Sequence, residues 1–323
     1  MKSALGRVSE AAVVAAAALV LAGCGQVEDN SSPAAPGART VETMFGPVEV
    51  PATPAKVVAL GWSDAETALA LGVRPIAASD WLGFGGEGVG PWAAGRYTTA
   101  PRILPTLELD YAAISTLAPD LILNTRSDNS EEKFKELSKI APTVSAPKDV
   151  VAYGTSWRQQ TELVAQALGK VDEGAKLIAE VDDAFAKAKD PAFEGKSVAV
   201  GAHYSDKYSA YLRGDSRVDF MESLGFKNKP EVQALANGSF SADLSREQIE
   251  LLSADLTVLF PIGSDGAVLR EDAILNQIPS AKAGHLLVLD DPNISNAFSS
   301  GSTLGTKYAI DKTVPMFKTA LGG

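Results

Sequence analysis

The sequence predicts an α/β fold made of two lobes with mainly parallel sheets, joined by one long helix. Three observations support this prediction. Strand-like and helix-like segments alternate along most of the chain, one helical segment in the middle is longer than the others, and a short internal repeat relates the two halves. Alternating strands and helices are typical of a parallel sheet with helices on both faces.

The first lobe is predicted to comprise residues 46–170. Val57–Leu60 is a short apolar strand, and the helical stretch that follows ends at Gly72, a favourable residue for a helix C-terminus. The next strand is expected at 75–78. Further helices are expected at 111–117 and 131–140, with strands at 121–123 and from 142.

Residues 171–190 are predicted to form the connecting helix. Val171–Lys189 contains no proline, and its apolar residues recur at helical spacing, as Leu177, Ile178, Val181 and Phe185 show. Strand–helix alternation then resumes, so residues 191–323 form the predicted second lobe.

The internal repeat indicates that the two lobes are similar. Ile114–Leu121 (ISTLAPDL) aligns with Ile249–Leu256 (IELLSADL), and Ala70–Val73 resembles Ser223–Phe226. The first pair predicts a helix end, a tight turn with an aspartate, and a strand. Since ligands of such folds bind outside the carboxyl ends of the strands, we expect a binding cleft between the lobes.

The N-terminus indicates the cellular compartment. Residues 1–23 have a basic start, an apolar run from Ala11 to Leu19 that is too short to span a bilayer, and small residues before Cys24, as in a secretory signal peptide. The last feature resembles the lipobox of bacterial lipoproteins, which implies cleavage before Cys24 and lipidation of its sulfur. Residues 24–45 are then the lipidated cysteine and a flexible tether. An ordinary secretory signal with an incidental cysteine is the alternative.

Composition excludes several kinds of site and partner. Cys24 is the only cysteine, so a mature protein acylated there has no disulfide, thiolate zinc site or cysteine nucleophile. The net charge of −11 argues against nucleic acid as a partner. We expect a monomer, anchored by its lipid to the extracytoplasmic face of the cell membrane.

Several segments resemble the iron-siderophore ABC transporter substrate-binding proteins, the FecB-like, helical-backbone class of periplasmic binding proteins. These are Lys56–Val73, Ala113–Leu123, Leu137–Val144 and Leu244–Ile249. The resemblance covers essentially the mature chain and is stronger in the first lobe. It implies two Rossmann-like lobes joined by a rigid helix, a cleft of limited closure lined by aromatic residues and arginines, and no catalysis. The implied function is delivery of a ferric siderophore to an ABC permease.

The family also implies a surface carboxylate on each lobe that docks on arginines of the permease. Glu247 matches the carboxylate of the second lobe, although an acidic residue favoured by a helix dipole is the alternative. The first-lobe counterpart falls on Ala112, which departs from the family pattern. Asp110 and Glu108 are the candidate substitutes, and loss of that contact is the alternative.

A ferric siderophore requires no resident cofactor and no metal ligands from the protein, because the chelator's own oxygens hold the iron. The protein needs flat apolar surface, hydrogen-bond donors and cations. Candidate ligand contacts lie after strands or in loops that could face the cleft: Trp62, Trp81, Arg126, Tyr153, Tyr204, Arg213 and Phe298. Core packing for the tryptophans and a solvated charge for Arg126 remain open. If both arginines bind the ligand, it carries an anionic group.

Other functions fit the sequence less well. A haem or corrinoid receptor on the same fold is the main alternative, with His203 as the candidate haem ligand; two histidines in all disfavour a zinc or manganese receptor. Residues 83–88 match G-x-G-x-x-G but do not open a helix, so a dinucleotide site is rejected. The nucleophile elbow G-x-S-x-G of α/β-hydrolases is absent.

Overall fold

The computed structural model describes residues 37–322, which belong to one compact unit. The predicted signal peptide, the predicted lipidation site at Cys24 and the tether up to residue 36 lie outside the described residues. Within residues 37–322, no helix is both long enough and apolar enough to cross a bilayer.

The first lobe contains a five-stranded sheet in which every pairing is parallel. Its strands, in spatial order, are β5 (Arg102–Leu104), β4 (Ala77–Ser79), β3 (Val57–Ala59), β6 (Leu121–Asn124) and β7 (Thr143–Ser145). The strands are short and wholly apolar at their centres because helices cover both faces. The helices of this lobe are α1 (Asp64–Ala70), η1 (Pro91–Ala93), α2 (Tyr111–Thr116) and α3 (Glu131–Ser138).

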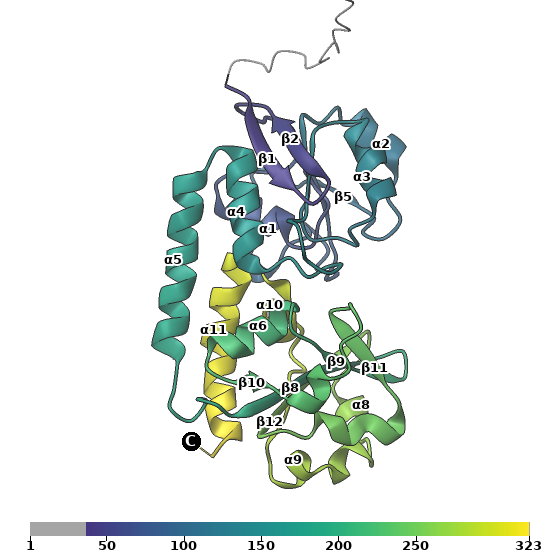
Figure 1. Ribbon diagram of the computed structural model, residues 1–323, viewed down its shortest axis with the longest axis vertical. Helices are drawn as coiled ribbons and strands as arrows, with labels where there is room; N and C mark the ends of the chain where they lie inside the picture. The colour runs from purple at the N-terminus through teal and green to yellow at the C-terminus, as the bar shows by residue number, and fades with distance from the viewer. Residues whose placement is uncertain (1–36, 323) are drawn as a thin grey trace, which may run out of the picture. The chain divides into compact units, whose positions relative to one another are not determined.

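A β-hairpin precedes this sheet and corrects the predicted extent of the tether. Strands β1 (Arg39–Thr43) and β2 (Gly46–Val50) pair antiparallel, so the tether predicted to extend to residue 45 ends before Arg39. Val41 and Val50 are buried in the core of the first lobe. The Arg39 guanidinium donates to the carbonyl oxygens of Ala52 at 2.6 Å and Ala167 at 2.9 Å. Apolar burial and these bonds fix the hairpin on the lobe (Figure 1).

The second lobe has a mixed six-stranded sheet. Strand β8 (Ser197–Tyr204) pairs in parallel with β10 (Lys227–Asn228) and β12 (Leu256–Ile262), and β12 pairs in parallel with β13 (Leu286–Val288). Strands β9 (Lys207–Tyr211) and β11 (Ser241–Leu244) are antiparallel to their neighbours. The chain reverses directly after β8 because Ser205 and Asp206 both adopt positive φ, as in tight hairpin turns.

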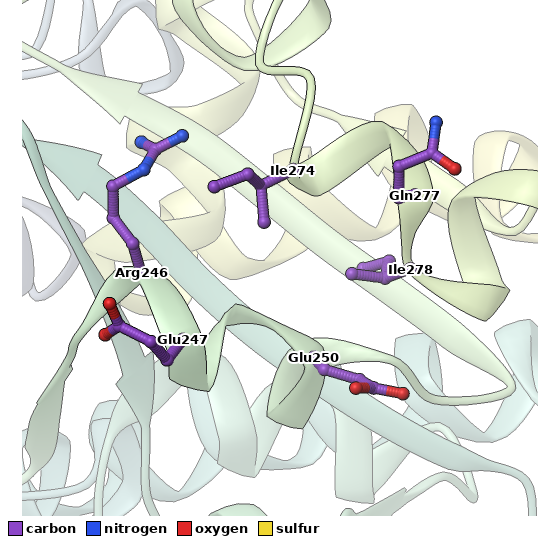
Figure 2. A pocket seen from close by; sticks show the side chains of 6 residues that line it. All are labelled: Arg246, Glu247, Glu250, Ile274, Gln277 and Ile278. Atoms are coloured by element: carbon purple, nitrogen blue, oxygen red, sulfur yellow. The ribbon is translucent and has the colours of Figure 1, made fainter.

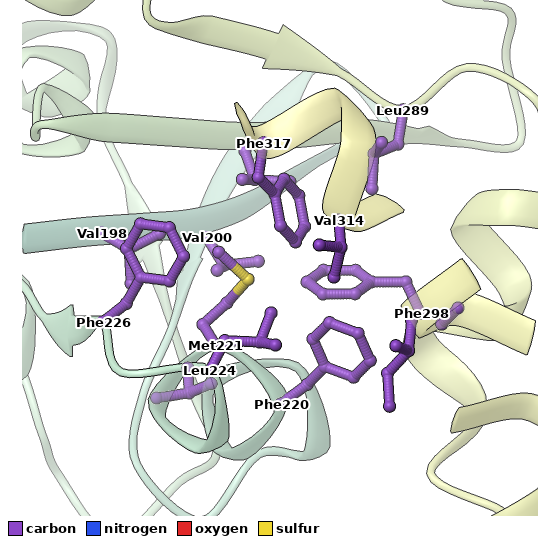
Figure 3. Packing of buried hydrophobic residues seen from close by; sticks show 14 of the residues in the cluster. Val198, Val200, Phe220, Met221, Leu224, Phe226, Leu289, Phe298, Val314 and Phe317 are labelled. Carbon is purple, nitrogen blue, oxygen red and sulfur yellow. The ribbon is translucent and has the colours of Figure 1, made fainter. Parts of the chain in front are cut away.

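Short helices surround this second sheet. They are α6 (Ser216–Ser223), α7 (Pro230–Gln233), η2 (Arg246–Leu252), α8 (Ala267–Arg270), η3 (Leu275–Gln277), α9 (Pro279–Lys282) and α10 (Pro292–Ser300). The core between α6, α10 and α11 (Thr303–Ala320) is rich in phenylalanine. Phe298 lies edge-on to Phe220, with ring centroids 5.2 Å apart, and the rings of both converge with Phe317 (Figure 3).

The internal repeat corresponds to equivalent structure in the two lobes. Asp120, in the first copy, accepts hydrogen bonds from the backbone N–H groups of Ala55 and Lys56, just before β3. Asp255, in the second copy, accepts one from the N–H of Ser197, at the start of β8. In each lobe the aspartate therefore joins the strand that follows it to the lobe's first parallel strand.

Three long helices lie together along the two lobes. Helix α4 (Trp157–Leu168) ends at Gly169 in the left-handed conformation, and α5 (Val171–Ala188) runs back alongside it and beside α11 (Figure 1). A Cβ on Gly174 would lie 2.5 Å from that of Ala165, so glycine permits the close approach of α4 and α5. Lys307 on α11 pairs with Glu180 on α5 at 2.6 Å. The predicted connecting helix is thus supported on both sides.

Candidate ligand-binding site

A cavity of about 800 Å³ opens between the lobes, a size typical of small-molecule sites. Side chains of both lobes line it. The first lobe contributes Trp62, Trp81 and Leu82, and the aromatic residues of the second lobe are Tyr204, Tyr211, Phe240 and Phe260.

The first-lobe wall follows directly from the parallel sheet. Trp62 and Trp81 come shortly after the neighbouring strands β3 and β4, whose carboxyl ends lie at the same edge. Their rings stack with centroids 4.2 Å apart and planes 7° apart. Tyr153 stacks on Trp62 with a centroid separation of 4.2 Å, so three rings form one layered surface.

The second-lobe wall is aromatic as well. Tyr211, at the end of β9, is nearly parallel to Phe260 on β12, with ring centroids 5.9 Å apart. Phe240, just before β11, lies 6.4 Å from Tyr211 and 6.3 Å from Trp62, measured between ring centroids. Phe240 therefore links the aromatic surfaces of the two lobes.

A buried ion pair lies behind this wall. The Arg217 guanidinium donates from Nε and Nη2 to the two carboxylate oxygens of Asp215, at 2.7 and 2.6 Å, and lies 3.6 Å from the centroid of Tyr211. Burial alone lowers the pKa of Arg217, but the Asp215 carboxylate more than offsets this and raises it above its usual value. Arg217 is therefore charged at every physiological pH.

Tyr204 has its hydroxyl committed to a neighbour. The phenol donates to Asp243 at 2.5 Å, and this hydrogen bond, together with burial, raises the pKa of Tyr204 to about 12. The tyrosine thus remains neutral, and its oxygen can accept a further hydrogen bond.

The sequence and several relatives identify the kind of protein to which this cavity belongs. The family model for periplasmic binding proteins matches residues 57–292. The chain belongs to the periplasmic binding protein family. Members of this family bind solutes and are not defined by catalysis.

Two proteins of Bacillus subtilis (strain 168) are similar to this binding protein over most of their lengths. The probable siderophore-binding lipoprotein YfiY is 28% identical, over 91% of this chain and 93% of its own. The petrobactin-binding protein YclQ is 25% identical, over 84% of this chain and 87% of its own. A periplasmic solute binding protein of Mycobacterium smegmatis is similar in structure, with a TM-score of 0.77 and 28% identity, covering 89% of this chain and all of that one. The fold is therefore the two-lobed α/β fold of this family.

The structure brings together four of the residues expected to bind ligand. Trp62, Trp81 and Tyr204 line the cavity, and Tyr153 supports Trp62 from behind. The other three predicted contacts do not line it.

Arg126 connects the lobes and does not face the cavity. Its side chain is 1% exposed, and all three nitrogens donate: Nε to Tyr153 O at 3.0 Å, Nη1 to Ser300 O at 2.9 Å and Nη2 to Ser216 Oγ at 3.0 Å. The guanidinium lies under the tryptophan pair, 5.7 Å from the centroid of Trp62. Burial lowers the pKa of Arg126 to about 10.

Arg213 and Phe298 are also corrections to the predicted site. Arg213 is exposed, and its Nε donates to Glu222 at 2.9 Å. Phe298 is not in a loop: it belongs to α10 and is 2% exposed in the phenylalanine-rich core. The helical spacing of the apolar residues in α10 was obscured by its serines, whose hydroxyls can bond to the helix backbone, as Ser299 does to Ser295 O.

The lining residues that were not predicted include the three aromatic residues Tyr211, Phe240 and Phe260 and the arginine Arg217. Tyr211 lies close to Tyr204 and Tyr208 in the sequence, and Phe260 ends the apolar run Leu256–Phe260, but neither pattern distinguishes a cavity residue from a packed strand residue. Arg217 had a local signal, since Asp215 precedes a helix and caps it by accepting from the Arg217 N–H at 2.9 Å. Phe240 follows a polar turn and carried no signal.

A second group of contacts joins the lobes at the turn between α10 and α11. Ser63 Oγ donates to Ser300 O at 2.5 Å, and Ser302 Oγ donates to the buried Glu66 carboxylate. Burial raises the pKa of Glu66, while its hydrogen bond from Ser302 opposes that rise. Together with Arg126, these bonds hold the first lobe against the C-terminal helices.

The predicted docking carboxylates are on the surface. Glu247 lies on η2 and is exposed beside a shallow cavity of about 330 Å³, with Arg246 and Glu250 on the same segment and Ile274 opposite (Figure 2). A hydrogen bond from Ser245 lowers the pKa of Glu247, so it is ionised at neutral pH. In the first lobe, Ala112 is exposed, and Asp110 caps α2 by accepting from the Ala113 N–H at 2.9 Å.

His203 lies away from the cavity. It is 6% exposed on β8, with its ring 5.0 Å from that of Tyr208 on the opposite face of the sheet from Ala202. Within residues 37–322, no three His, Cys, Asp or Glu side chains are grouped so that they could hold a metal ion.

Proposed function

We propose that this protein is the extracytoplasmic receptor of an ABC importer and that it binds a ferric siderophore in the cavity between its lobes. The observation that carries the proposal is a cavity lined from one lobe by the stacked Trp62 and Trp81, with Tyr153 packed on Trp62, and from the other lobe by Tyr211 and Phe260, in a chain of the periplasmic binding protein family. Flat rings bind the organic frame of a chelate by apolar contact. The relatives YfiY and YclQ, both named for siderophores, support the same ligand class.

In this proposal the chelator holds the iron and the protein has no resident cofactor. The haem alternative is weaker, since His203 lies away from the cavity. The receptor acts as a monomer, because each chain carries a complete cavity, and it binds no nucleic acid.

The test is a titration of the intrinsic tryptophan fluorescence of the purified protein. Ferric siderophores, haem and cobalamin are added separately, because Trp62 and Trp81 line the cavity and report its occupation. We expect the tryptophan fluorescence to be quenched saturably by a ferric siderophore. Haem and cobalamin should cause no saturable quenching. Trp62→Phe should remove most of the signal change, whereas Trp157→Phe, in the core away from the cavity, should retain it. Saturation by haem or cobalamin alone would contradict the proposal.

We further propose that Glu247 docks on the permease and that Asp110 takes the corresponding part in the first lobe. Both are exposed carboxylates on opposite lobes, and Glu247 has an exposed apolar neighbour, Ile274, at 44%. Charge reversal by Glu247→Arg should leave ligand affinity unchanged and abolish uptake of the iron complex by cells. Glu250→Arg, a control in the same cavity, should reduce uptake far less. Equal losses for both variants would remove the special role of Glu247.

The final element of the proposal is the lipid on Cys24. The name of the relative YfiY includes a lipoprotein assignment, which supports it. Cys24→Ala should move the protein from the membrane fraction to the soluble fraction of expressing cells and stop incorporation of labelled palmitate. Retention on the membrane together with loss of the label would mean that something other than this lipid anchors the chain.

A further inference from the structure

The charges around the cavity carry information on the ligand that its aromatic lining does not. Among the described residues that line the cavity, Arg217 is the only lysine or arginine. Its positive charge is neutralised by Asp215, which takes two of its donors and is 1% exposed. The cavity therefore contains an ion pair in place of a free cation.

Carboxylates at the mouth of the cavity make its surroundings more negative. Asp290 lines the cavity and pairs with Arg270, whereas Asp265 lines it and takes part in none of the ion pairs found in residues 37–322. Asp265 is exposed and caps the Ala267 N–H at 2.9 Å. An approaching anion would meet this carboxylate at the entrance.

Among the described residues, the lining also contains neutral donors such as Ser264 and Asn296, but no second cation. The Tyr204 hydroxyl donates to Asp243, so its oxygen faces a ligand as an acceptor. Arg126 uses all three of its nitrogens on Tyr153, Ser300 and Ser216 and is buried under the tryptophans. The sequence suggested that Arg126 and Arg213 bind an anionic group of the ligand, but neither arginine lines the cavity.

The aromatic walls offer no positive charge to an anion. Trp62 is stacked between Trp81 and Tyr153, with ring centroids 4.2 Å away in both pairs, so its faces are covered by other rings. The Arg217 guanidinium covers one face of Tyr211 and is itself paired with Asp215. The aromatic lining therefore adds apolar contact, and the carboxylates set the sign of the charge at the cavity.

We propose that the cavity selects ferric chelates without net negative charge, which points to the trihydroxamate class. This inference rests on the proposed siderophore function. Each hydroxamate loses one proton on chelation, so three of them neutralise one Fe³⁺. Each catechol loses two, so a tris-catecholate complex is a trianion, and chelates built on several carboxylates are also anionic. Like charges brought together in a partly desolvated site weaken binding strongly.

The experiment compares dissociation constants of the same protein for chelates of different charge. A neutral ferric trihydroxamate (ferrichrome), a cationic one (ferrioxamine B) and a ferric tris-catecholate trianion built on catechol amides, which carry no free carboxylate, are titrated at low and high salt. We expect the trianion to bind at least about 100-fold more weakly than the better trihydroxamate, with the difference shrinking as salt screens the carboxylates.

A charge-reversal variant tests the cause. Asp265→Lys should reduce the ratio of the dissociation constants for the tris-catecholate and the trihydroxamate about tenfold, because it improves the affinity for the trianion. Glu231→Lys makes the same change of charge on α7, outside the cavity, and should leave this ratio of dissociation constants unchanged. A trianion that binds the unmodified protein as tightly as a trihydroxamate overturns the inference and leaves the siderophore function intact. Binding of haem or cobalamin, with no binding of any ferric chelate, overturns both.

Discussion

Replacing Arg126 separates a structural role from a role in ligand binding. The change Arg126→Met keeps an unbranched, flexible side chain and removes the three hydrogen bonds to Tyr153, Ser300 and Ser216. A hydrogen bond from a charged group contributes about 1.5–3 kcal/mol, so three together contribute at most roughly 4.5–9 kcal/mol. The cost of burying the guanidinium, which also lowers the pKa of Arg126, opposes this contribution. We therefore expect the free energy of unfolding to fall by about 3–5 kcal/mol.

Urea unfolding followed by far-ultraviolet circular dichroism measures this loss. With slopes of about 2–3 kcal/mol per molar urea, the midpoint should fall by about 1–2 M. The matched control is Arg213→Met, which removes an exposed ion pair with Glu222 and should cost no more than about 1 kcal/mol. Ligand affinity of the folded Arg213 variant should not change. If Arg126→Met left the midpoint unchanged and weakened ligand binding, Arg126 would be a ligand contact and the role assigned to it would be wrong.

Two further predictions concern stability. Phe298→Ala should lower the free energy of unfolding by about 3–5 kcal/mol, because it empties the core beside Phe220 and Phe317, and the folded fraction should keep its affinity for ligand; a loss of affinity without loss of stability would contradict this. Burial, followed by the nearby Asp215 and Glu222 carboxylates, raises the pKa of Asp219 to about 6. Its unfolded-state pKa is near 4, so between about pH 4 and 6 the folded state binds more protons and stability falls as pH rises. Asp219→Asn should therefore stabilise the protein by up to about 3 kcal/mol at pH 7.5 and have almost no effect at pH 4, as thermal melts at the two pH values would show. An equal gain at both values would exclude titration of Asp219 as the cause.

The sequence was sufficient for the parts of the site that depend on local order along the chain. Trp62 and Trp81 follow neighbouring parallel strands, and a parallel sheet places such residues at one edge whatever the loops do. The same rule explains why the internal repeat predicted two similar lobes. The alternation of strands with helices and the position of a residue just after a strand are both set by neighbouring residues in the sequence, so the fold keeps them.

The rest of the site depends on contacts between distant segments. Phe240 reaches Trp62 only because β11 pairs with β9, which itself reverses after β8. Arg126 follows a strand like the tryptophans do, yet it turns inward because Ser216 and Ser300 of the second lobe supply acceptors. Nothing in the residues next to Arg126 specifies those partners. The hairpin at 39–50 is different: its alternating valines and the turn at Gly46 were readable, but the polar composition of the preceding segment outweighed them.

The stacked indoles of Trp62 and Trp81 give the protein an optical signature of its own. Two chromophores whose ring centroids lie 4.2 Å apart couple their electronic transitions, and the in-plane twist between the rings sets the sign and size of the resulting far-ultraviolet dichroism. Any solute that wedges the rings apart would remove this contribution to the spectrum, whereas one that rests on the outer face of Trp81 would preserve it. The spectrum of the unlabelled receptor can thus distinguish insertion from overlay.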